Sequence, residues 1–139
     1  MATTVRDVMT ERPKTVEANE TIVETARHMR DEDIGAVVVL KGSRVIGIVT
    51  DRDIVVRAVA DGRFPGGATI GEIATGEPVT VGPEETLENA AALMREKAVR
   101  RLPVVENDQP VGIISIGDLA VNAEGSVPIE EISSAPPNN

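Results

Sequence analysis

The sequence predicts a mixed α/β (α+β) protein made of two β-α-β-β-α repeats that pack about a pseudo-two-fold axis. The main observation is an internal duplication, because residues 65 positions apart match without gaps along most of the chain, which marks a repeated structural unit. Each half has about 60 residues, which is marginal for a separate core, so the halves are expected to pack on each other. Identical pairs include Thr10/Thr75, Pro13/Pro78, Thr15/Thr80, Val16/Val81, Glu20/Glu85, Gly47/Gly112 and Asp53/Asp118.

Local patterns in the first repeat predict its elements. Lys14–Glu17 is a short extended piece. Thr21–Glu24 fits a capping box, with Thr at the N-cap and Glu at N3, so a helix is expected to follow. Two strands are predicted at 36–40 and 45–49, and a second helix from Thr50 to about residue 60. The second repeat is expected to retrace this order.

These elements divide the chain along its sequence. Repeat 1 covers 1–61, a Gly- and Pro-containing linker covers 62–69, and repeat 2 covers 70–125. The remaining residues, 126–139, are rich in Pro, Ser and Asn and are expected to form a flexible C-terminal tail.

Composition excludes several classes of function. The net charge of −9 argues against nucleic-acid binding, which depends on Lys and Arg at phosphates. Phe64 is the only aromatic residue, so a base-stacking platform is not available. There is no Cys for disulfides or thiolate chemistry. No signal pattern and no run of about 18 apolar residues is present, so we expect a cytoplasmic protein without membrane contact.

One motif closes both repeats: glycine, two β-branched residues, a hydroxyl residue, two spacers and Asp, at 47–53 and 112–118. A hydroxyl followed three residues later by an acid is typical of a helix cap. The same arrangement suits a nucleotide, since free N–H groups at a helix start attract phosphate and a carboxylate accepts hydrogen bonds from a ribose diol. The sequence leaves both interpretations open.

The duplicated motif and the strand Arg-Leu-Pro-Val-Val at 101–105 resemble paired cystathionine β-synthase-type (CBS) domains, over roughly residues 5–122. The chain is similar to the stand-alone CBS-pair type found in bacteria. The resemblance implies adenine-nucleotide binding in clefts between the repeats and a flat, disc-like homodimer. It implies no cofactor beyond this ligand, which is an adenine nucleotide or an S-adenosyl compound.

The resemblance also assigns roles to residues. Asp53 and Asp118 would hold ribose, while Thr50 and Ser115 would approach phosphate. The other positions implied in nucleotide binding are Thr15, Val16, Gly35, Ala36, Val37, Thr80, Val81, Leu102, Pro103 and Gly117. For Val16, Val37, Val81 and Leu102 a core position is an equal alternative, and Gly35 alternatively ends a helix.

Arginines distinguish the two repeats. Arg100 and Arg101 precede the 101–105 strand and have Gly35 and Ala36 as counterparts. They are either a solvated pair or a phosphate clamp, because a guanidinium fork matches phosphate oxygens. Arg52 is a second candidate, and its counterpart is Gly117. The two sites are therefore expected to differ in affinity.

Enzymatic and metal chemistry find little support in the sequence. His28 is the only histidine, and we expect it to be a half-buried helix residue rather than a ligand or a base. Without Cys or a second His, a transition-metal site is poorly supplied. No nucleophile–base pair or Walker-type loop is present, so no enzyme is predicted.

Two hypotheses for function follow. The leading one is a regulatory module that binds AMP, ADP or ATP and signals through its dimer surface to an unknown protein target. The alternative is a protein-interaction or stress-response scaffold that does not depend on nucleotide, which the lack of Arg at 35–36 favours.

Overall fold

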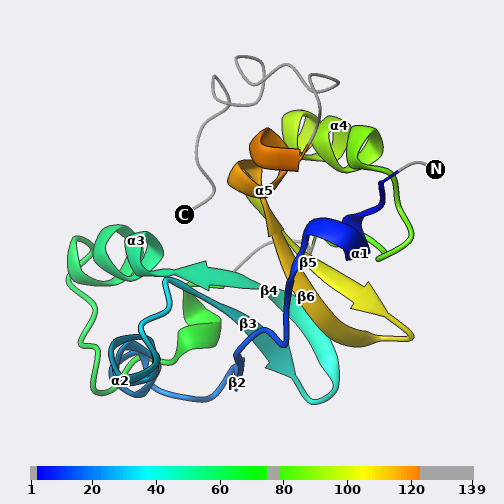
Figure 1. Cartoon of the computed structure of the whole chain (residues 1–139). Coiled ribbons are helices and arrows are strands. Elements are labelled where there is room, and N and C mark those ends of the chain that lie inside the picture. Colours follow the sequence, from blue (N-terminus) through cyan, green and yellow to red (C-terminus); the bar gives the residue numbers. More distant parts are fainter. Residues whose placement is uncertain (1–2, 75–78, 123–139) are drawn as a thin grey trace. The chain divides into compact units, whose positions relative to one another are not determined.

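The computed structural model describes residues 3–74 and 79–122 (Figure 1). They form two compact units. The first unit comprises residues 14–74, and the second unit comprises residues 3–13 together with 79–122. Thr75–Pro78 and the predicted tail at 126–139 lie outside the described residues.

The first unit is built on a three-stranded sheet in the order β2-β3-β4, with β2 parallel and β4 antiparallel to β3. Its strands and helices agree with the predicted order and, within a residue or two, with the predicted bounds. The helix predicted from Thr50 begins as α3 and continues as η1, a π-helical stretch. The elements are β2 (Thr15–Glu17), α2 (Ile22–Glu32), β3 (Ala36–Lys41), β4 (Arg44–Thr50), α3 (Asp51–Asp53), η1 (Ile54–Val59) and the 3₁₀ turn η2 (Ile70–Glu72).

The cap predicted for α2 is confirmed at its hydroxyl, since Thr21 Oγ1 accepts a hydrogen bond from the Glu24 N–H at 3.1 Å. The Glu24 carboxylate instead pairs with Arg27 at 3.0 Å, so it contributes charge to the helix surface.

The second unit has a three-stranded antiparallel sheet in the order β1-β6-β5. The prediction of a first strand in repeat 2 is wrong, because Val81 makes only a single parallel bridge to Val104. Gly82 and Pro83 follow at once, and both residue types disfavour strand interiors. The elements are α1 (Val5–Val8), β1 (Thr10–Glu11), α4 (Leu87–Lys97), β5 (Arg101–Glu106), β6 (Gln109–Ser115) and α5 (Ile116–Asn122).

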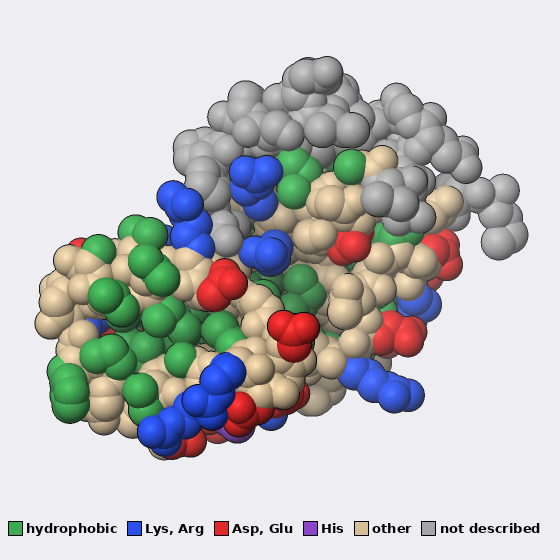
Figure 2. All heavy atoms as spheres, turned by 60° about the vertical axis from the view of Figure 1, so that its left-hand side comes forward, with side chains coloured by type: hydrophobic (Ala, Val, Ile, Leu, Met, Phe, Trp, Pro, Cys, Tyr) green, Lys and Arg blue, Asp and Glu red, His purple; other side chains and the backbone are tan. Residues whose placement is uncertain are grey.

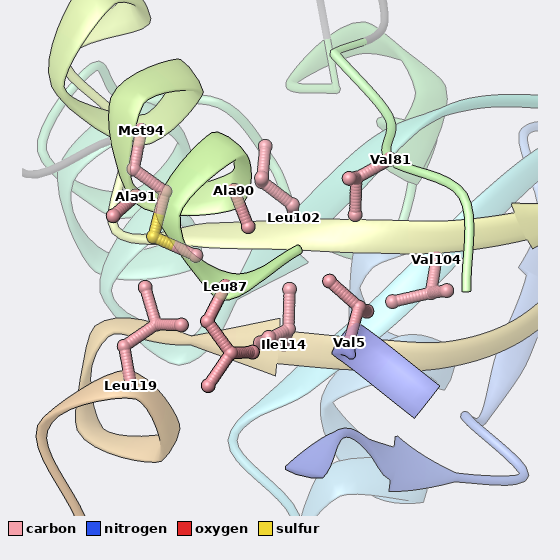
Figure 3. Packing of buried hydrophobic residues seen from close by; sticks show 10 residues of the cluster. All are labelled: Val5, Val81, Leu87, Ala90, Ala91, Met94, Leu102, Val104, Ile114 and Leu119. Atoms are coloured by element: carbon pink, nitrogen blue, oxygen red, sulfur yellow. The ribbon is translucent and has the colours of Figure 1, made fainter. Parts of the chain in front are cut away.

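Each unit has its own hydrophobic cluster. In the second unit α4 packs Leu87, Ala91 and Met94, which share one face of the helix, over strands β5 and β6, where they meet Leu102 and Ile114 (Figure 3). In the first unit the buried residues are Val16, Ile22, Met29, Val37, Val39, Val49, Ala58, Ile70, Ile73 and Ala74.

The short arm that precedes each repeat also follows the duplication. Thr4–Asp7 and Thr69–Glu72 stand 65 residues apart, and in both the carboxylate accepts from the backbone N–H of the threonine, at 2.9 and 2.7 Å. Val5 and Ile70, which follow these threonines, are 0% exposed. The arm of repeat 1 belongs to the second unit, and the arm of repeat 2 belongs to the first. Each unit is thus completed by the arm that precedes the other repeat.

Candidate functional site

The Thr-x-x-Asp turn of the first unit joins β4 to α3. Thr50 Oγ1 accepts a hydrogen bond from the Asp53 N–H at 3.2 Å. In return, Asp53 Oδ2 accepts from the Thr50 N–H at 2.8 Å and from its hydroxyl at 3.2 Å. The pair is a reciprocal capping box. The capping interpretation is therefore correct for this turn, and it uses one oxygen of the carboxylate.

The Ser-x-x-Asp turn of the second unit has the same pair of hydrogen bonds from its backbone N–H groups. The Ser115 N–H donates to Asp118 Oδ2 at 2.8 Å, and the Asp118 N–H donates to Ser115 Oγ at 3.2 Å. The difference lies in burial, since Asp53 is 2% exposed whereas Asp118 is only half-buried.

The first turn is held at one end of its sheet. The Asp51 N–H donates to Gly35 O at 3.1 Å, and Ala36 lies opposite Thr50 in the β3–β4 ladder. Because β2 runs parallel to β3, its first residue, Thr15, begins near the same end. The structure therefore places Gly35 and Ala36 beside the strand-to-helix turn and Thr15 toward the same end of the sheet.

The second turn is held in the same manner. The Ile116 N–H donates to Arg100 O at 2.9 Å, and Arg101 lies opposite Ser115 in the β5–β6 ladder. Val81 adds its backbone, with its N–H donating to Pro103 O at 3.1 Å. Thr80, just before Val81, is exposed.

Several predicted ligand contacts have buried side chains. Val16, Val37, Val81 and Leu102 are 4%, 0%, 7% and 0% exposed and belong to the two hydrophobic clusters. Pro103 is buried as well. The core interpretation accounts for these side chains, and their contact with a ligand stays a prediction.

The charged residues around the two turns differ. Arg52 is exposed beside the first turn, and its backbone N–H donates to Asp51 Oδ1 at 2.8 Å. A methyl group at Gly35 would lie 3.5 Å from Asp51 Oδ2, an ordinary contact, so packing there does not require glycine. The second turn has the half-buried Arg100 and Arg101 at the corresponding strand and the exposed Gly117 in place of Arg52. The first turn is richer in acid, and the second is richer in base.

Sequence reasoning did not find Arg57, whose Nε lies 3.7 Å from Asp53 Oδ1. The available signal was the i, i+4 spacing of an acid and an arginine on one helix face.

His28 is half-buried on α2, as predicted. Its Nε2 lies 3.3 Å from Glu20 Oε1, and its Nδ1 lies 3.8 Å from Glu32 Oε2. Within the described ranges, 3–74 and 79–122, no group of three or more His, Cys, Asp or Glu residues is placed to hold a metal ion. None of the helices in these ranges is long and apolar enough to cross a membrane.

The family follows from a comparison of the whole chain. The CBS domain model matches twice, at residues 5–59 and 70–124. The chain therefore belongs to the CBS domain family, as the resemblance predicted. It is 42% identical over 118 residues to the CBS domain-containing protein YhcV of Bacillus subtilis, covering 85% of this chain and 84% of that protein. It is 37% identical over 119 residues to hypoxic response protein 1 of Mycobacterium tuberculosis, covering 85% and 83%.

Solved structures confirm the predicted CBS-pair fold. Hypoxic Response Protein I with two coordinated zinc ions matches with a TM-score of 0.76 at 37% identity, over 86% of this chain and 98% of that one. The CBS domain pair of MJ0100, in complex with 5′-methylthioadenosine and S-adenosyl-L-methionine, has a TM-score of 0.76 at 26% identity, over 91% and 99%. A hexameric CBS-CP12 protein from bloom-forming cyanobacteria has a TM-score of 0.79 at 28% identity, over 89% and 74%.

Proposed function

We propose that this protein is a cytoplasmic regulatory CBS-pair module that binds an adenosine-containing small molecule and passes its bound state to a protein target. The observation that carries the proposal is the duplicated turn. In each copy a hydroxyl residue ends a strand, β4 or β6, and an acid follows three residues later. The complex of the MJ0100 pair with two adenosyl compounds supports this ligand class.

The chemistry of each turn suits a ribose. The cap uses Oδ2 of Asp53 and Oδ2 of Asp118. A carboxylate has about four lone-pair positions on its two oxygens and accepts hydrogen bonds from hydroxyl groups, so we assign the ribose diol to these two acids. In this assignment Asp53 and Asp118 hold ribose, and Ser115 marks the start of the helix that faces the phosphate of a ligand at the second turn.

The charges divide the ligands between the turns. Arg100 and Arg101 favour a phosphorylated ligand such as AMP, ADP or ATP at the second turn. At the first turn Asp51 adds a second carboxylate beside Gly35, which disfavours phosphate. A nucleoside without phosphate, or a cationic S-adenosyl compound, fits that environment better.

A thermal-unfolding series with AMP, ADP, ATP and S-adenosylmethionine tests the proposal. A ligand at 100 times its dissociation constant should add about 2.7 kcal/mol to the free energy of unfolding. The shift should shrink in Asp53→Ala for S-adenosylmethionine and in Asp118→Ala for the phosphorylated ligands. The absence of any shift in the unmodified protein would contradict nucleotide binding.

The alternative is a scaffold that acts without nucleotide. It is favoured by the capping role of both acids and by the burial of Asp53, since a cap alone explains these contacts. Dimerisation and partner capture that do not respond to AMP, to S-adenosylmethionine or to Asp53→Ala would support it.

A homodimer is part of the proposal, and an apolar face of the first unit supports it. Val55, Val56 and Val59 on η1 are 58%, 45% and 59% exposed, and Phe64 after the helix is 76% exposed. Figure 2 shows apolar side chains gathered on this side of the molecule. Exposed apolar clusters commonly mark interfaces. Light scattering should report a dimer for the unmodified protein and a smaller species for Val55→Asp with Val59→Asp.

A further inference from the structure

Arg57 joins two parts of the first unit that are distant in sequence. Its Nε lies 3.7 Å from Oδ1 of the buried Asp53. Its Nη1 donates a hydrogen bond to the carbonyl oxygen of Ile73 at 3.1 Å. The guanidinium is a rigid planar fork, so its two ends cannot move independently. A shift of Arg57 away from Asp53 therefore disturbs its bond to Ile73.

A second arginine strengthens this link. Arg63 donates from Nε to the carbonyl oxygen of Arg57 at 3.2 Å and from Nη1 to Glu72 Oε1 at 3.2 Å. Glu72 in turn accepts from the Thr69 N–H at 2.7 Å. The end of η1 is thus connected to the Thr69–Ile73 stretch through both arginines.

The segment Ile70–Ala74 is part of the core of the first unit. Ile70, Ile73 and Ala74 are 0%, 2% and 8% exposed. The Gly71 N–H donates to Ala18 O at 2.9 Å, and a methyl group at Gly71 would lie only 2.8 Å from Ala18 Cβ. Along the chain, this segment precedes residue 79, where the second unit resumes. Any change in it occurs in the stretch that leads from one unit to the other.

We propose that Arg57 couples the Thr50–Asp53 turn to the segment Ile70–Ala74, so that a ligand engaging Asp53 Oδ1 displaces the arginine and loosens the segment. The ligand step rests on the function proposed above. Because Asp53 is 2% exposed, a ligand hydroxyl reaches its carboxylate only if neighbouring atoms move. Arg57, whose side chain is 46% exposed, is the charged neighbour that has space to do so.

Arg57 has no arginine at its counterpart position in repeat 2. The counterpart of Arg57 in repeat 2 is Asn122, which is uncharged and shorter. Occupancy of the first turn is therefore transmitted through Arg57, and occupancy of the second turn is not transmitted by an equivalent arginine.

Hydrogen exchange of the full chain, measured with and without saturating S-adenosylmethionine, the probe assigned above to the first turn, tests the coupling. Saturating AMP, assigned to the second turn, is measured beside it and should leave the exchange of the same amides unchanged. The informative amides are Ile73 and Ala74, which donate to Ile70 O at 3.2 Å each. In the unmodified protein bound S-adenosylmethionine should raise their exchange rate about fivefold, the factor for one hydrogen bond of ordinary net strength. Arg57→Met should show the raised rate without a probe and no further change with it.

The matched control is Arg27→Met, which removes an arginine that pairs with Glu24 within the same helix. It should respond as the unmodified protein does. If Arg57→Met does not fold, Arg57→Gln replaces it in the test. Glutamine keeps a donor for Ile73 O and removes the charge facing Asp53. That variant should keep the slow exchange of the unliganded protein and lose the response to the probe.

The outcomes separate the two proposals. S-adenosylmethionine that stabilises the protein without changing exchange at Ile73 and Ala74 overturns the coupling, as does a normal response to S-adenosylmethionine in Arg57→Met. Failure of both probes to bind contradicts the proposed function and removes the ligand trigger. In that case equal exchange of unliganded Arg57→Met and unmodified protein also overturns the role of Arg57 in holding the segment.

Discussion

The two strand-to-helix turns share one pattern of backbone N–H hydrogen bonds and differ in the residues that surround it. In both, the backbone N–H of the hydroxyl residue donates to the acid at 2.8 Å. Asp53 is 2% exposed beside Arg57, whereas Asp118 is half-buried on a strand-to-helix turn bordered by Arg100 and Arg101. The capping box is local and needs only two side chains, so it persisted in both copies. The flanking charges diverged, and they are what would select a ligand.

The largest expected effect concerns the two hydrophobic cores. Shortening corresponding buried strand residues to Ala should reduce the free energy of unfolding by different amounts. Leu102 and Val37 are counterparts, and both are 0% exposed. Leu102→Ala should cost about 2–5 kcal/mol in the free energy of unfolding, because it removes apolar contacts and leaves a cavity. Val37→Ala should cost roughly 2 kcal/mol, since fewer carbons are lost. Urea denaturation measures both losses. A smaller loss of stability for Leu102→Ala than for Val37→Ala would contradict this expectation.

The arginines should separate the turns in binding. Replacing Arg100 and Arg101 by Met should weaken AMP binding about 10- to 100-fold, because charge-assisted hydrogen bonds contribute roughly 1.5–3 kcal/mol. Arg52→Met should leave AMP affinity nearly unchanged, since we assign phosphate to the second turn. Isothermal titration calorimetry checks this pair of variants. Equal losses in both would show that the turns do not divide the ligands by charge.

The acids should separate the turns in stability. Asp118→Ala should cost about 1 kcal/mol in the free energy of unfolding, the usual value of a lost cap. Asp53→Ala should cost closer to 2 kcal/mol, since it also removes the partner of Arg57 and leaves a buried space. Thermal unfolding in the absence of ligand is the measurement. A larger loss of stability for Asp118→Ala than for Asp53→Ala would contradict the expectation that the first turn contributes more to the free energy of unfolding.

The smallest expected effect concerns how stability depends on pH at Thr69–Glu72, the arm that precedes repeat 2 and belongs to the first unit. Hydrogen bonds from the backbone and then the hydroxyl of Thr69 lower the pKa of Glu72 below its ordinary value of 4.5, and the charge of Arg63 adds to this. The stabilisation is present above pH 4.5 and is lost as the pH falls through the lowered pKa of the folded state. Glu72→Gln should melt at a lower temperature than the unmodified protein at neutral pH. This difference in melting temperature should become smaller as the pH is lowered. A constant difference down to strongly acidic pH would exclude this contribution.

Much of the fold could be predicted because its signals are local. The 65-residue offset, the alternation of strand and helix patterns, and the hydroxyl-acid caps each depend on residues close in sequence. The strand expected at the start of repeat 2 failed for a reason already visible in Gly82 and Pro83. The candidate site was predicted as a set of residues, and the ladders place most of that set around two turns.

The sequence by itself determined the duplication, the two hairpins and the two capped turns, because these arise from short-range hydrogen bonds and from periodic burial. Only the tertiary structure decided that Val5 packs with the second repeat and Ile70 with the first, since arms of this kind dock through contacts between residues far apart in the chain. It also decided that Arg57 reaches Ile73 from Asp53. The spacing of Arg57 and Ile73 carries no local signal, and their contact exists only because the core of the first unit holds η1 against the arm.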